Sequence, residues 1–258
     1  TLSQVAIYGN GQAFQYMISR TGEQPLGELR RVARRAYEEL HKVTPSFLRR
    51  LEGDASQEYQ RHLVARRAKV AEYLPVDVDQ RLILGEPDPR VELVEWDPAG
   101  EDKGITGLLF DSDRNHTSWS ETLRRVQEMS QSERRGVLAA HFDGRTARWQ
   151  KLGRAFENTY VRFEIIMDLG AYRDLHRHRM QTQQRQLFSC HHGYYTPVEI
   201  VQAGAEEAYS SAIERAQEVF ASLDGHDPYV AQYAVPLAQY VRFQQWQNLR
   251  SFAWETEL

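Results

Sequence analysis

The sequence contains a single cysteine, Cys190, and it lacks any apolar run of about 18 residues, the length that a membrane-spanning helix needs. One thiol excludes an intrachain disulfide and is compatible with a reducing compartment, so we expect a cytoplasmic protein that does not cross a membrane. Residues 1–7 carry no positive charge and no long apolar core, which argues against a signal peptide. Because the sequence does not begin with methionine, we expect a processed or partial chain.

Glycine motifs that bind phosphate are also absent. Neither Gly-x-Gly-x-x-Gly nor a P-loop occurs, so side-chain cations would have to hold the phosphates of a bound nucleotide. Lysine and arginine number 32 against 36 aspartates and glutamates, and the net charge of −4 argues against general nucleic-acid binding. The composition is that of a globular protein, and 258 residues fit one large domain or two smaller ones.

Two further kinds of site receive little support from residue spacing. Four histidines lie close together in the sequence, at His176, His178, His191 and His192. Residues two apart or adjacent do not share one face of a helix, and no Cys-x-x-Cys or His-Glu-x-x-His motif is present, so a metal site is not predicted. Cys190 has no activating partner at a known spacing, which favours a buried, unreactive thiol.

Local patterns predict a mixed set of helices and strands. Six segments are predicted to be helical, because they show apolar residues at a spacing of three and four, capping residues, or a lack of Gly and Pro. They are residues 26–43, 57–73, 118–129, 132–140, 203–223 and 241–254. Capping-box patterns begin at Ser118, at the start of one of these helices, and at Thr196, ahead of the helix over 203–223. Alternation of apolar and polar residues predicts strands over 91–96 and 158–167, and the stretch 99–117 is expected to be a loop.

A basic segment follows the second predicted strand. In a helix, Arg173 and Arg177 would be neighbours four residues apart, and the repulsion of like charges there costs a few tenths of a kcal/mol. A phosphate or pyrophosphate would remove that cost; the alternative is a solvated basic helix face. Six basic residues lie within this segment: Arg173, His176, Arg177, His178, Arg179 and Arg185.

Several motifs occur in a recognisable order along the chain. They are a first strand (91–96), a Phe-Glu-Asn that leads into a second strand (156–163), an Arg-His-Arg motif (177–179), a Pro-Leu segment (235–237), an aromatic stretch (240–246) and an Asn-x-Arg-Ser motif (248–252). This order resembles that of the flavin-dependent thymidylate synthases, the ThyX family. The resemblance covers residues 91–258, and the ordered set is more specific than Arg-His-Arg alone.

The resemblance implies an α+β fold, an antiparallel sheet with long packed helices, in a homo-oligomer whose subunits share the active site. Such enzymes bind FAD, use NADPH as reductant and methylenetetrahydrofolate as one-carbon donor, and convert dUMP to dTMP. The cofactors carry the chemistry, and the protein supplies cations and orientation.

The motif match also implies roles for individual residues. Those that would contact FAD are Arg177, His178, Arg179, Asn248 and Arg250. Arg177 would also lie near the dUMP substrate. Gln232 stands at a second substrate-binding position, where the family has an arginine ahead of its Leu-Pro segment.

Other positions depart from the family pattern. Residues that replace a family serine, arginine, glutamate, glutamine, histidine or asparagine are Leu187, Ser189, Arg185, Asp174, Asn158, Gln232 and Trp254. Charge-assisted contacts are worth about 1.5–3 kcal/mol each, so their loss would weaken nucleotide binding by orders of magnitude. The scaffold is thus expected to be kept and the substrate pocket rewritten. Two alternatives stay open: a non-catalytic assembly or binding partner that keeps the fold, and a flavin or nucleotide enzyme with another substrate.

The N-terminal part contains a weak internal echo. The pentad Asn10-Gly-Gln-Ala-Phe14 is similar to Asn248-Leu-Arg-Ser-Phe252. We therefore predict that residues 1–90 form a helical segment, the tail of a preceding ThyX-like copy, and that residues 91–258 form a ThyX-like domain. An unrelated helical extension is the alternative.

Overall fold

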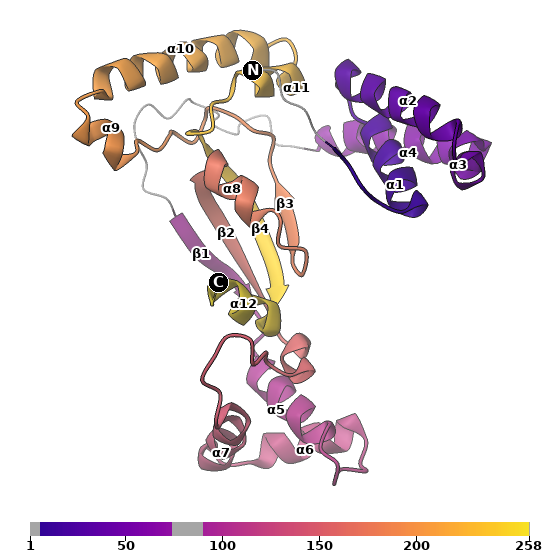
Figure 1. Cartoon of the computed structure of the whole chain (residues 1–258). Helices are drawn as coiled ribbons and strands as arrows, with labels where there is room; N and C mark the ends of the chain where they lie inside the picture. Colours follow the sequence, from indigo (N-terminus) through magenta and orange to yellow (C-terminus); the bar gives the residue numbers. More distant parts are fainter. Residues whose placement is uncertain (1–5, 74–89, 258) are drawn as a thin grey trace. The chain divides into compact units, whose positions relative to one another are not determined.

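The computed structural model describes residues 6–73 and 90–257. Contacts within the chain define two compact units, Thr1–Gln80 and Arg81–Leu258, which Figure 1 shows in indigo and in magenta to yellow. The predicted domain boundary at residue 90 adjoins residues 74–89, which lie outside the described residues. Among the described residues, no helix combines the length and apolarity needed to cross a membrane.

The described residues of the N-terminal unit form four helices. Its helices are α1 (Gly11–Gly22), α2 (Gly27–His41), α3 (Pro45–Glu52) and α4 (Asp54–Ala71). Ile18, Ala33 and Leu48 form its small core, one residue from each of the first three helices. Helix α1 is capped by Asn10, whose side-chain Oδ1 accepts a hydrogen bond of 2.9 Å from the backbone N–H of Ala13.

A four-stranded antiparallel sheet forms the centre of the second unit and confirms the α+β class. The strands are β1 (Arg90–Trp96), β2 (Tyr160–Asp168), β3 (Thr182–Arg185) and β4 (Tyr240–Asn248), in the order β1-β2-β4-β3. Strands β2 and β4 pair along their whole length, from Tyr160 opposite Asn248 to Asp168 opposite Tyr240. Two strand predictions, 91–96 and 158–167, are therefore confirmed.

One face of the sheet packs against α8 (Leu169–Leu175) and α12 (Leu249–Thr256). The alternating apolar residues of β2 that predicted the strand lie on this face. Ile165 of β2 packs with Val241 and Phe243 of β4 and with Tyr172 of α8, and these residues are almost completely buried. Phe252 of α12 stacks on Phe163, with ring centroids 5.3 Å apart.

The predicted helix over 241–254 is wrong for its first half, because β4 occupies Tyr240–Asn248 and only then does α12 begin. A lack of Gly and Pro permits a helix but does not select one. Alternate residues of this stretch are buried, including Val241, Gln245 and Gln247. Pairing with strands on both sides therefore decided its conformation.

Three helices gather at the end of the strands where β4 finishes (Figure 1). They are α5 (Gly100–Phe110), α6 (Trp119–Glu128) and α7 (Gln131–Phe142), and the 3-10 helix η1 (Arg154–Asn158) lies beside α5. The predicted helices over 118–129 and 132–140 are confirmed. The expected loop over 99–117 is wrong: α5 carries glycines that lower helix propensity, yet a Cβ on Gly107 would come within 2.8 Å of the Ala155 Cα.

The opposite end of the strands carries α9 (Val198–Gln202), α10 (Glu206–Asp224), α11 (Pro228–Ala231) and the 3-10 turn η2 (Gln232–Ala234). The long predicted helix over 203–223 corresponds to α10. The capping box expected at Thr196 does not form, since α9 begins after Pro197 with no side-chain cap. Gly204, with a φ of +65°, separates α9 from α10.

Candidate functional site

The Arg-His-Arg motif lies in a turn and not on a helix. Helix α8 ends at Leu175, and Arg177, His178 and Arg179 occupy the connection between α8 and β3. The predicted helical repulsion between Arg173 and Arg177 is therefore wrong. Arg177 instead forms an ion pair with Asp174, and both side chains are about three-quarters exposed, at 74% and 77%.

This turn borders a cleft that α12 also lines. One hollow of about 250 Å³ lies against Arg177–Gln181, and a second of about 200 Å³ lies against the segment 145–157. Met180, Ser251 and Trp254 line both hollows, so the two adjoin. We call them together the cationic cleft, after its basic residues Arg145, Arg148, Lys151, Arg177, His178, Arg179 and Arg250.

The structure thus brings together basic residues that are about seventy positions apart in sequence. Four of the five residues that the resemblance assigns to FAD line the cationic cleft: Arg177, His178, Arg179 and Arg250. The fifth, Asn248, is the last residue of β4 and caps α12. Its Oδ1 accepts a hydrogen bond of 2.8 Å from the backbone N–H of Ser251. This cap fixes the start of the helix that carries Arg250, Ser251 and Trp254.

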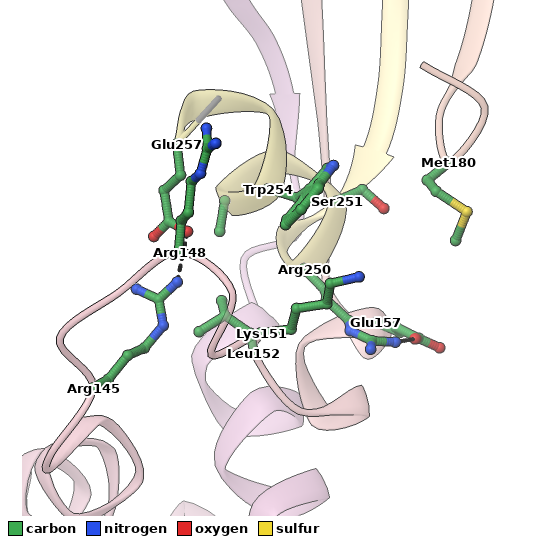
Figure 2. Close-up of a pocket in the computed structure, with 11 residues that line it drawn as sticks. Arg145, Arg148, Lys151, Leu152, Glu157, Met180, Arg250, Ser251, Trp254 and Glu257 are labelled. Carbon is green, nitrogen blue, oxygen red and sulfur yellow. Dashed lines mark hydrogen bonds and ion pairs between the residues drawn. The ribbon is translucent and has the colours of Figure 1, made fainter. Parts of the chain in front are cut away.

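Two carboxylates hold arginines of the cleft in place (Figure 2). Arg250 pairs with Glu157 of η1, and Arg145 pairs with Glu257 at 2.6 Å. The hydrogen bond from Arg250 lowers the pKa of Glu157, and the hydrogen bond from Arg145 lowers the pKa of Glu257. Both carboxylates are therefore ionised at neutral pH, and both guanidinium groups have a fixed orientation.

An aromatic ring lies where the two hollows meet. The ammonium of Lys151 lies 4.6 Å from the centre of the Trp254 ring, a cation–π contact. Trp254 stands where the resemblance places an asparagine or histidine, so this contact is a departure from the family pattern. Sequence reasoning missed the wall formed by Arg145, Arg148 and Lys151. A signal existed, because basic residues recur at every third position there.

Gln232 lies outside the cationic cleft. It belongs to η2, where its Oε1 accepts a hydrogen bond of 3.2 Å from the backbone N–H of Phe188. Its amide nitrogen lies 3.4 Å from the carbonyl oxygen of Tyr229. The chain therefore brings one of the two predicted substrate residues, Arg177, to the cleft but not the other, and the predicted role of Gln232 stays a prediction.

Cys190 lies in the core beside α10, and the two histidines that follow it, His191 and His192, are partly buried. Cys190 is fully buried, and burial raises the pKa of its thiol to about 12, which leaves it protonated and unreactive. His191 lies 3.7 Å from Asp224 and meets the ring of Phe220 edge-on. Burial lowers the pKa of His192 to about 4. Within residues 6–73 and 90–257, no three His, Cys, Asp or Glu side chains form a group suited to a metal ion.

Comparison with known proteins places this chain in a family. The model of a family described as thymidylate synthase complementing protein, Thy1, matches residues 113–258. A UPF0159 protein from Chlamydia pneumoniae is 35% identical over 263 residues, which cover 100% of this chain and 48% of that protein. A UPF0159 protein from Chlamydia muridarum is 30% identical over 263 residues, which again cover 100% of this chain and 48% of that protein. The chain thus spans about half the length of the curated relatives it matches.

A solved structure is similar to part of this chain. The UMP/dUMP methylase PolB from Streptomyces cacaoi, in a crystal structure bound with 5-Br dUMP, is 18% identical, with a TM-score of 0.48. The match covers 64% of this chain and 75% of that chain. The family model, which spans more than half of the sequence, is what assigns the chain: it belongs to the Thy1, or ThyX, family.

Proposed function

We propose that this protein binds FAD in the cationic cleft and, by the chemistry of its family, methylates a uridine nucleotide, converting dUMP to dTMP with methylenetetrahydrofolate and NADPH. One observation carries the FAD part of the proposal. Arg177, His178 and Arg179, which precede β3, line the same cleft as Arg250, which follows β4. A pyrophosphate needs several cations from different directions, and this convergence supplies them.

The residues of the cleft fit such a group in their chemistry. Arginine presents a planar fork of donors that matches phosphate oxygens, and Arg179 has no ion-pair partner among the described residues. Bound FAD would supply hydride transfer, which no side chain of the cleft performs. The protein would hold the phosphates, orient the ring and exclude water. The uridylate part of the proposal depends on family membership, since Gln232 lies elsewhere.

Cofactor content tests this proposal directly. We expect protein purified without added ligand to be yellow, or to take up FAD on titration, and to show the visible absorbance of an oxidised flavin. Release of tritium from 5-tritiated dUMP, in the presence of methylenetetrahydrofolate and NADPH, tests the methylation step. A colourless protein that takes up no FAD would overturn the proposal. Flavin binding without tritium release would point to a flavin or nucleotide enzyme with another substrate.

A second candidate function is favoured by the ion pairs of the cleft. Arg177 pairs with Asp174 and Arg250 pairs with Glu157, so two cations assigned to FAD already have acidic partners within the chain. These pairs suit a family member that keeps the fold without the cofactor and serves as an assembly or binding partner. Failure to bind FAD, combined with stable association with a second copy or an active family member, would support this candidate.

We also propose that the N-terminal unit is the tail of a preceding ThyX-like copy. Asn10 and Asn248, the first residues of the two similar pentads, both cap a helix with nearly the same backbone angles: φ −79° and ψ 168° at Asn10, φ −80° and ψ 161° at Asn248. Relatives of about twice the length agree with two copies. An experimental structure of such a relative should contain two antiparallel sheets, each followed by an asparagine-capped helix; a single sheet would contradict the proposal.

A further inference from the structure

The ring of Trp254 is the one aromatic surface at the junction of the two hollows among the residues that line them. Basic side chains lie on either side of it: the Arg-His-Arg turn borders one hollow, and Arg148 and Arg250 border the other. Figure 2 shows Trp254 on α12 with Lys151 next to it. A ligand whose planar ring is joined to phosphate meets an aromatic face and cations together at this position.

Lys151 occupies one face of that ring. Its ammonium lies 4.6 Å from the ring centre, which is cation–π distance. A planar heterocycle that stacks on this face must displace the ammonium. The lysine side chain is long and flexible, so the displaced ammonium stays within the cleft, where it can pair with a phosphate of the same ligand.

Gln181 supplies a second, independent observation. It lines the hollow beside the Arg-His-Arg turn, and its side-chain nitrogen is buried without a hydrogen-bond partner among the described residues. A buried amide donor without a partner is costly, and a carbonyl oxygen or ring nitrogen of a heterocycle would satisfy it. The same hollow thus contains a stacking surface, an amide donor and cations for phosphate.

From these contacts we infer that Trp254 is the stacking surface for the heterocycle of a phosphate-bearing ligand, and that Lys151 exchanges its contact with this ring for a contact with the ligand's phosphate. This inference rests on the proposed function and names residues that determine its specificity. Trp254 selects for a planar ring, Lys151 selects for phosphate on that ring, and Gln181 selects for a hydrogen-bond acceptor on its edge.

Three probes separate ring from phosphate: riboflavin, which has the ring alone; FMN, which has both; and inorganic pyrophosphate. Each is titrated by calorimetry into the wild type and into four variants. Trp254→Ala should weaken the binding of riboflavin and FMN about tenfold and leave the binding of pyrophosphate unchanged, because the loss of a stacking contact typically costs a factor of about 5 to 150. Trp254→Phe should stay within about threefold of the wild type. Gln181→Leu should weaken the two flavins and spare pyrophosphate.

Lys151→Met gives effects of opposite sign, which a merely structural role would not produce. It removes the competing cation but keeps the length of the side chain, so riboflavin should bind more tightly and pyrophosphate more weakly. Trp149→Ala is the control for Trp254→Ala, since Trp149 is 76% exposed and lies outside the residues that line the cleft. Lys69→Met, at an exposed position of α4 that is also outside those residues, is the control for Lys151→Met. Thermal melting of every variant tests its folding.

The outcomes distinguish this inference from the proposed function. If the wild type binds flavins and Trp254→Ala binds them equally well, the inference is wrong and the proposed function stands. If Trp254→Ala does not fold, Lys151→Met decides, and looser or unchanged riboflavin binding in that variant overturns the exchange. If the wild type binds neither FMN nor FAD, both the proposed function and the inference are overturned.

Discussion

The two ends of the sheet hold histidines in different environments. At one end, Arg177, His178 and Arg179 lie in a turn beside a cleft, where water and small anions have access. At the other end, Cys190 lies in the core next to α10 and His192 is partly buried; burial raises the pKa of the thiol and lowers the pKa of the imidazole. Histidine content alone therefore says little about function. The environment decides which basic groups can carry a charge toward a ligand.

The largest expected effect tests whether the buried end is purely structural. Phe220 of α10 is 1% exposed and packs with Cys190 and Ala231. Phe220→Ala should lower the free energy of unfolding by about 3–5 kcal/mol, because it leaves a cavity in the core. Urea unfolding measures this loss, with Val219→Ala, which alters an exposed neighbour, as the control. If both variants lowered the free energy of unfolding by the same small amount, the end of the sheet beside α10 would not be the structural core that the comparison assumes.

The second prediction tests the cleft end. Arg177→Ala should weaken FAD binding by about 1.5–3 kcal/mol, the value of a charge-assisted hydrogen bond, with little change in stability because the side chain is exposed. Fluorescence titration with FAD measures the affinity. Arg173→Ala removes an exposed arginine of α8 that does not line the cleft and should have no effect. Equal affinity in both variants would show that the Arg-His-Arg turn is only a basic surface.

The third prediction concerns pH and the buried end. His192 has a pKa of about 4 in the folded protein, against 6.5 for an unperturbed histidine, so the unfolded chain binds more protons between these values. The free energy of unfolding should therefore fall as the pH is lowered from 6.5 to 4, with a contribution from His192 on the order of 1–2 kcal/mol. Urea unfolding at pH 6.5 and 4.5 measures it.

His192→Gln should lose this contribution, and the difference between variant and wild type isolates it from the titration of carboxylates. His226→Gln, at an exposed position, is the control. If His192→Gln keeps the full pH dependence of the wild type, the pKa of the His192 imidazole is not lowered in the folded protein. The two ends of the sheet would then not differ in the environment of their histidines.

The smallest expected effect sharpens the comparison at the cleft end. Asn248→Ala removes the cap of α12 and should lower the free energy of unfolding by about 1 kcal/mol. FAD affinity should fall with it, since α12 carries Arg250 and Trp254. Asn10→Ala removes the matching cap of α1 and should lower stability without any change in FAD affinity. Thermal melting and FAD titration of both variants give the result; a loss of affinity in both would argue against a specific role of α12.

Sequence patterns predicted those elements whose conformation depends on residues close together in the sequence. The alternation of Val161 to Met167 predicted β2, and Ser118 marked the start of α6. Partners far away in the sequence decided the rest. Residues 241–248 became a strand because β2 and β3 pair with them, and two glycines of α5 are tolerated because they lie against other segments, Gly107 against Ala155 of η1 and Gly100 against Thr159. Neither cause is visible within a window of ten residues.

The site was predicted in part for the same reason. The Arg-His-Arg and Asn-x-Arg-Ser motifs identified Arg177, His178, Arg179 and Arg250, which do line one cleft. Residues that match no family motif were missed, above all Lys151 and its contact with Trp254. Which of its neighbours a lysine touches depends on how the segment 145–157 folds back toward α12, and no spacing rule states that.

The strand order has a consequence for how this protein is made. Strand β4 lies between β2 and β3, yet it is the latest of the four strands in the sequence. While a ribosome synthesises the chain, β3 emerges with no neighbour to pair with, and the Arg-His-Arg turn beside it has no opposite wall. When β4 inserts, it pairs with both β2 and β3, and α12, which follows it directly, is brought next to the Arg-His-Arg turn in the same step. A nascent chain that stops short of residue 240 therefore lacks the wall of the cationic cleft that α12 provides.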